Sequence, residues 1–274
     1  MNRLIQFYIL LLIFSVQVIF SQENLKKDNV ELILPEDKII QGTWGQEADE
    51  IKLFSEIKIL DELSEENTKK WLEKSRDNFN TAITEFKDTA QKINKKKEKM
   101  FAEVDALDIY QWRKDARKEN IERKLNTELI KARKKSIVNL IKGMQSIDKI
   151  ENPEVLQTPI YTDLKASLYR EYIKHQFNLK NYYQASEMIE EYFKVGRKEG
   201  DIYGEFEKEA MPHKLLAICY ESVEKVAKKY NKKALYMEYN ELKNKHIIRY
   251  AELAYGKDSN QYNRVIKKLG MKLN

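Results

Sequence analysis

Apolar residues recur at alternating intervals of four and three between residues 79 and 107, a segment that contains neither glycine nor proline. One position of this pattern holds a lysine, Lys97, in place of an apolar residue. A period near 3.5 residues is typical of a helix that packs along another helix with a left-handed supercoil. The apolar positions of this seam are Phe79, Ile83, Phe86, Ala90, Ile93, Met100, Val104 and Leu107.

Glycine and proline are absent from the whole of residues 46–142. A single helix of that length would measure about 145 Å, and runs beyond about 25 residues indicate a coiled coil or stacked helices. Asn67 and Thr68 are good amino-terminal caps, so we expect one helix over about residues 47–63 and a second from about Thr68. The second helix carries the seam.

The seam weakens after Leu107, where Gln111 and Lys114 occupy positions that the pattern reserves for apolar residues. The chain then forms either an elbow or a continuing helix with its apolar face turned. Helical periodicity resumes and must end before Pro153. The sequence thus predicts a long helical rod or hairpin over residues 46–152, paired either within one chain or between chains.

The C-terminal part, residues 153–274, is rich in tyrosine: fourteen of the sixteen tyrosines lie between Tyr161 and Tyr262. Its first segment resembles a tetratricopeptide repeat, although Ile173 replaces the family's glycine and the closing proline is absent. Residues 212–230 and 232–245 form a second expected helix pair, and residues 246–270 a third, partial unit that caps the stack. The residues expected in the first pair are Tyr169, Tyr172, Ile173 and Gln176 on its first helix, Asn181 and Tyr182 in the turn, and Ala185, Ile189 and Tyr192 on its second helix. The fold class expected is all-α, with long coiled-coil-like helices projecting from a domain of this repeat type.

The N-terminus has the pattern of a secretory signal peptide over residues 1–21: Arg3, an apolar run over residues 4–20, and Ser21 at a cleavage point. The alternative is an uncleaved membrane anchor. No cysteine follows the apolar run, so we do not expect a lipoprotein. Residues 22–45 are expected to form an extended arm that packs on its own body or on a neighbouring subunit.

Charge is high in both signs, with 50 Lys and Arg against 44 Asp and Glu and a net charge of +6. The two signs are interleaved, as on solvated helix faces. Together with export, this balance argues against a nucleic acid as partner. Lys95–Lys97 and the basic stretch at residues 131–136 form either a solvated face or a contact for an acidic polymer or an anionic membrane surface.

Catalytic and metal-binding patterns are not recognisable in the sequence. His175, His213 and His246 have no second ligand at metal spacing, so we interpret them as interface or surface residues. Cys219, the one cysteine, lies among apolar residues and is interpreted as a buried thiol. The glycines at 196, 200 and 204 lack the context of a phosphate loop and indicate a loop between helices. We expect no enzyme, no cofactor, no metal and no stable membrane span after signal cleavage.

The tyrosines suit either of two roles, because their rings pack in cores and their hydroxyls suit wet interfaces. They fill the core of a glycine-poor domain, or some of them form a binding surface. The candidate interface residues are Tyr182, Tyr183, Tyr236, Tyr239, Trp112, Lys95, Lys96 and Lys97.

The tyrosine-rich segment 168–193 and the lysine-rich segments 94–101 and 131–142 give the chain an overall plan that resembles the flagellar-coiling proteins of spirochaetes. These are sheath proteins of periplasmic flagella. The resemblance implies a non-enzymatic periplasmic subunit that coats the filament, promotes its coiling, and has other sheath or filament proteins as partners. The alternative is a periplasmic or surface adaptor that binds proteins or peptides in its repeat groove; an enzyme would need a deep pocket with convergent polar groups.

Overall fold

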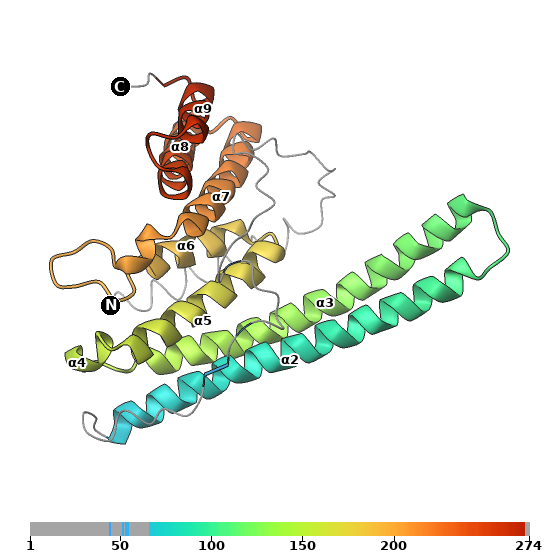
Figure 1. Ribbon diagram of the computed structural model, residues 1–274, viewed down its shortest axis with the longest axis horizontal. Helices are drawn as coiled ribbons and strands as arrows, with labels where there is room; N and C mark the ends of the chain where they lie inside the picture. The colour runs from blue at the N-terminus through green and yellow to red at the C-terminus, as the bar shows by residue number, and fades with distance from the viewer. Residues whose placement is uncertain (1–43, 45–50, 52, 55–65, 272–274) are drawn as a thin grey trace. The chain divides into compact units, whose positions relative to one another are not determined.

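The computed structural model describes residue 44, residue 51, residues 53–54 and residues 66–271 (Figure 1). The chain divides into two compact units, Met1–Ile33 and Leu34–Asn274, and all described residues belong to the second. Within residues 66–271 every regular element is a helix, so the all-α prediction is confirmed. The expected signal peptide and most of the arm lie outside the described residues. Of the expected helix at 47–63 only residues 51, 53 and 54 are described, and these three are not helical, so the helix expected there is wrong at these positions.

Two long helices form an antiparallel hairpin within one chain (Figure 1). α2 spans Glu66–Asp105 and α3 spans Gln111–Ile147. The chain reverses at residues 106–110, so the elbow is the correct one of the two alternatives for this stretch. The partner of the seam is therefore another helix of the same chain.

The hairpin buries four of the eight apolar positions of the seam and half-buries three others. Phe79, Ile83, Ile93 and Val104 are all less than 8% exposed. Leu107 was expected in the seam but is 36% exposed, because α2 ends two residues earlier and Leu107 lies in the turn.

Lys97 is accommodated in the seam by two contacts. Its ammonium lies 2.7 Å from the carboxylate of Glu122 on α3 and 5.1 Å from the ring centre of Phe101. The aliphatic stem covers apolar surface while the charge stays at the rim.

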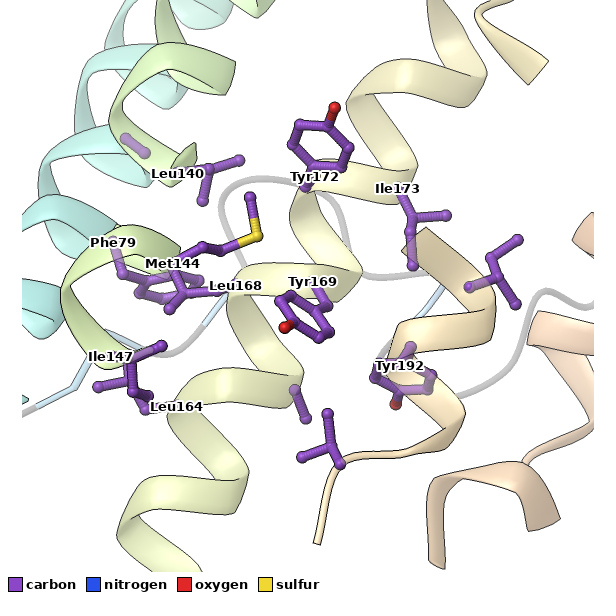
Figure 2. Packing of buried hydrophobic residues seen from close by; sticks show 14 of the residues in the cluster. Phe79, Leu140, Met144, Ile147, Leu164, Leu168, Tyr169, Tyr172, Ile173 and Tyr192 are labelled. Atoms are coloured by element: carbon purple, nitrogen blue, oxygen red, sulfur yellow. The ribbon is translucent and has the colours of Figure 1, made fainter. Parts of the chain in front are cut away.

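The side chains buried along the hairpin belong to two separate clusters. The far cluster joins only α2 and α3 and contains Ile93, Val104, Ile121 and Leu125. The other is the main core, in which Phe79 and Met144 of the hairpin meet Leu168 of α5 (Figure 2). Gly143 allows this approach: a Cβ there would lie 2.6 Å from Leu168 Cδ2.

The expected first pair of the C-terminal part is confirmed. After the short α4 (Pro153–Leu156), α5 (Pro159–Asn178) and α6 (Tyr182–Phe193) form adjacent helices. Proline stands in the first turn of α4 and of α5, where its missing N–H is not needed. Ala185, Ile189 and Tyr192 are fully buried, as the repeat-like pattern predicted.

The remaining elements are η3 (Glu205–Lys208), α7 (Ala210–Lys229), α8 (Lys233–Tyr255) and α9 (Asn260–Lys268). α7 and α8 form the second pair, in agreement with the sequence. The third unit was placed wrongly: residues 246–255 continue α8, because nothing at His246 interrupts the helix. The glycines at 196, 200 and 204 lie in the loop between α6 and η3, as expected.

Candidate functional site

Three tyrosines from three helices form a cluster on the C-terminal part. Tyr220 of α7 and Tyr239 of α8 have ring centres 5.6 Å apart. The pKa of Tyr183 of α6 is raised, first by its hydrogen bond to Glu187 and then by burial, with a smaller contribution from Tyr239. Tyr183 is 43% exposed, whereas Tyr220 is buried and donates a hydrogen bond to Glu190 at 3.1 Å. Tyr183, Tyr220 and Tyr239 are called the tyrosine cluster below.

The other two candidate tyrosines have separate environments. Tyr182 packs its ring edge-on against Phe177 at 5.4 Å and is half-buried, so it belongs to the α5–α6 turn. Tyr236 is half-buried near Lys228, whose ammonium lies 6.0 Å from the ring centre. Six of the fourteen tyrosines between Tyr161 and Tyr262 are buried in the core, and the other eight are half-buried or exposed.

Exposed apolar side chains gather where α7 ends and α8 begins. They come from the last turn of α7, the connecting turn and the first turns of α8, and each is at least 40% exposed. Because these exposed apolar groups come from neighbouring turns, they form a candidate interaction surface. This apolar end consists of Val226, Tyr230, Leu235 and Met237.

Trp112 stands at the start of α3, beside the hairpin turn, and is 64% exposed. The guanidinium of Arg113 lies 5.1 Å from its ring centre. Trp112 is therefore separated from the tyrosine cluster in the sequence, and it belongs to a different helix. The structure does not bring these candidates into one site.

The lysine cluster is engaged mainly within the hairpin. Lys96 donates to Glu128 at 2.7 Å, and Lys97 pairs with Glu122. Lys95 is exposed. The ion pairs link α2 to α3, so two of the three candidate lysines already have partners in their own chain.

Trp44 has a specific socket on the C-terminal part. Its indole N–H donates to Glu209 Oε2 at 2.6 Å, and its ring packs edge-on against Tyr192 at 5.4 Å. The Tyr192 hydroxyl donates to the same carboxylate oxygen at 2.9 Å and accepts from Arg170 at 2.8 Å. Burial raises the pKa of Tyr192, which keeps this hydroxyl a donor. Trp44 therefore packs on its own chain; the sequence had left the arm's position open.

The histidines are buried, and the surface interpretation is wrong for all three. His213 and His246 stack with ring centres 5.2 Å apart, and His175 packs against Phe86 and contacts Ser136 Oγ at 2.9 Å. Burial is the largest cause of the lowered pKa values of all three histidines. The pKa falls to about 3 for His175 and for His246. Sequence spacing missed these contacts because each joins residues more than thirty positions apart.

Cys219 is fully buried on α7, as expected. Burial raises the pKa of its thiol to about 12, so the reactive thiolate does not form near neutral pH. Among residues 66–271 no three His, Cys, Asp or Glu side chains are placed to share a metal ion. No helix in this described part has the length and hydropathy to cross a membrane.

Fold and surface together define an all-α protein with an intrachain helical hairpin, paired helices and exposed aromatic and apolar side chains. The model of the FcpA family matches residues 78–271, which include most of the hairpin and all of the C-terminal helices. The chain therefore belongs to the FcpA family, and the resemblance to the flagellar-coiling proteins is confirmed. A search of curated proteins found no match.

Proposed function

We propose that this protein is a non-enzymatic, exported subunit of the sheath of a periplasmic flagellar filament and that it contributes to filament curvature and motility. The observation that carries the proposal is the FcpA family match over residues 78–271. Export rests on the signal-peptide pattern of residues 1–21. Other sheath or filament proteins are the proposed partners.

The hairpin supports a structural role. α2 has 40 residues, which corresponds to about 60 Å of helix. Ion pairs and two apolar clusters hold it to α3, so it needs no second chain to stay paired. A long helical element that is held together within its own chain suits a structural subunit.

The proposed contact surface is the tyrosine cluster together with the apolar end of α7 and α8. Tyrosine is a frequent energetic anchor in protein interfaces, and the surrounding apolar groups exclude water. Tyr183 and Tyr230 are the exposed aromatic members, at 43% and 50%. Two candidate lysines are already paired within the hairpin, so we assign the anchoring to these aromatic residues.

Deletion of the gene tests the role. Filaments should still assemble but should lose their normal curvature, and the cells should move poorly. Electron microscopy of purified filaments and tracking of cells measure both. Normally curved filaments and unimpaired movement in the deletion strain are the result that rules the role out.

A double substitution, Tyr183→Ser with Tyr230→Ser, tests the surface. The variant should fold normally and be lost from purified filaments. Tyr110→Ser is the matched control, because Tyr110 is 73% exposed on the hairpin turn and lies outside the proposed surface. Equal retention of the double variant and of the control would place the interface elsewhere.

A cavity of about 320 Å³ beside α5 favours a second candidate, an adaptor that binds proteins or peptides. The two candidates differ in how the protein associates with filaments. A sheath subunit remains on filaments through washing, whereas an adaptor is released. Fractionation of cells and washed filaments distinguishes them.

A further inference from the structure

A cavity of about 320 Å³ lies where α4, the first half of α5 and the C-terminal end of α6 meet. It is the cavity that favours the adaptor candidate, and its lining shares no residue with the tyrosine cluster or with the apolar end of α7 and α8. Its volume is at the lower end of the range for small-ligand sites, so it suits one side chain or a small acid. The polar lining includes Tyr161, Lys165, Tyr169, Glu191, Lys194 and Arg197.

Lys165 is held in place at the centre of this lining. Its ammonium donates to Asp148 Oδ1 at 2.9 Å and to the Tyr161 hydroxyl at 3.1 Å. It also lies 5.4 Å and 5.8 Å from the ring centres of Tyr161 and Tyr169. An ammonium has three N–H donors, so one donor has no acceptor among the described residues.

The two tyrosines supply further donors. The Tyr161 hydroxyl accepts from Lys165, and its own proton is therefore available to another acceptor. The Tyr169 hydroxyl makes no hydrogen bond to a described residue. Burial raises the pKa of Tyr169 to about 12, so this hydroxyl remains protonated. Both rings are about 95% buried, which fixes their positions.

Arg197 adds a guanidinium at the rim. Its backbone carbonyl accepts from the Gln157 side chain at 3.2 Å, which ties the loop after α6 to the end of α4. The guanidinium forms no ion pair with a described residue. The nearby acidic groups are engaged, since Glu191 accepts from Lys194 at 2.7 Å and Asp148 accepts from Lys165.

We propose that this cavity binds a carboxylate, either the acidic side chain or chain end of a protein partner or a free small dicarboxylic acid. The lining has more free donors than free acceptors, and charge-assisted donors of this kind bind carboxylates. The tyrosine rings and Leu156 provide apolar walls for the carbon chain that carries the carboxylate. The inference does not depend on a flagellar role, since binding is measured on the isolated protein.

Titrations followed by nuclear magnetic resonance test the proposal at constant ionic strength. The probes are glutarate, acetyl-Ala-Glu-Ala-amide, acetyl-Ala-Ala with a free carboxyl end, and inorganic phosphate. The reporters are the backbone amide of Gly196 and the side-chain amide of Gln157. At least one carboxylate probe should give saturable shifts, and the probe that binds most tightly identifies the source as free acid, side chain or chain end.

Two conservative variants assign the binding to the cavity. Arg197→Gln should weaken the best probe by about tenfold, and Tyr169→Phe should weaken it by a smaller factor, because charge-assisted hydrogen bonds are the stronger ones. Arg264→Gln is the control, since Arg264 is exposed on α9, away from the lining. Thermal unfolding confirms that each variant is folded.

Three results would overturn the proposal. One is the absence of saturable shifts with every carboxylate probe, and another is unchanged affinity in both Arg197→Gln and Tyr169→Phe. The third is tighter binding of inorganic phosphate than of any carboxylate, which would assign the cavity to a different anion.

Discussion

The Nδ1 atoms of His213 and His246 lie 2.9 Å apart and share one hydrogen bond between α7 and α8. His213 Nε2 lies 2.8 Å from the carbonyl oxygen of Glu207, which only accepts, so the proton of the neutral His213 ring is on Nε2. His213 Nδ1 is then the acceptor and His246 Nδ1 the donor. The bond requires His213 to stay neutral, and it links the two helices and η3.

Folding stability should fall as the pH decreases below neutrality. The folded pKa values of His175 and His246 are about 3, below the usual 6.5, with burial as the first cause. A lowered folded pKa means that the unfolded chain binds protons more readily, so the stabilisation is present above pH 6.5 and is lost progressively toward pH 3. Each of these two histidines should reduce the unfolding free energy by about 2 kcal/mol between pH 7.5 and pH 5. Urea unfolding at the two pH values measures the loss.

The variant His246→Asn measures how much of this pH-dependent loss of stability comes from the histidine pair. Asparagine retains a donor for His213 Nδ1 but does not titrate. The loss of stability between pH 7.5 and pH 5 should therefore be smaller than in the unmodified protein. An identical pH dependence would show that His246 does not contribute, and that His175 or other titrating groups account for the acid sensitivity.

Replacing Lys97 by leucine should stabilise the hairpin. The substitution completes the apolar seam and gives up an ion pair with Glu122 whose two side chains are 41% and 52% exposed. Exposed ion pairs contribute little, and partial burial of a leucine contributes more, so we expect a gain of about 0.5–1 kcal/mol. Lys96→Leu is the control, because Lys96 has a similar ion pair but does not occupy a seam position. Chemical unfolding measures both; an equal effect of the two substitutions would contradict the seam argument.

The two clusters of the hairpin should respond differently to truncation. Ile83 lies in the main core, so the substitution Ile83→Ala should lower the unfolding free energy by about 2–4 kcal/mol. Ile93→Ala lies in the far cluster, which joins only α2 and α3, so local opening should increase there first. Hydrogen exchange of the amides around Ile121 and Leu125 should accelerate in Ile93→Ala while exchange in α5 stays slow. Faster exchange throughout the chain would show that the two clusters unfold as one.

Trp44→Phe should cost about 1–2 kcal/mol of stability. The change keeps an aromatic ring beside Tyr192 but removes the indole N–H that donates to Glu209. Trp112→Phe is the matched control, because Trp112 is 64% exposed and should change stability by less than about 0.5 kcal/mol. Equal effects of the two substitutions would mean that the Trp44 socket does not stabilise the fold.

Local patterns were sufficient for the existence and type of the helices. The alternating spacing of four and three between apolar residues indicated α2. A helix brings residues back to the same face every 3.6 residues, whatever it packs against. Pro153 indicated that the helix before it ends, and the repeat-like spacing, including the small Ala185, indicated the pair of α5 and α6. The family resemblance also rested on such patterns. Boundaries that depend on packing were less accurate, as at Leu107 and at the expected break before His246.

The tertiary structure alone decided which residues meet. The seam of α2 needed a partner, and only the reversal at residues 106–110 made that partner α3. The same long-range pairing buried the histidines and engaged Lys96 and Lys97 with α3. It also assembled the cavity around Lys165 from α4, α5 and the loop after α6. A sequence pattern records the periodicity of each helix, whereas these contacts follow from how whole helices pack to bury their apolar faces, which no local pattern records.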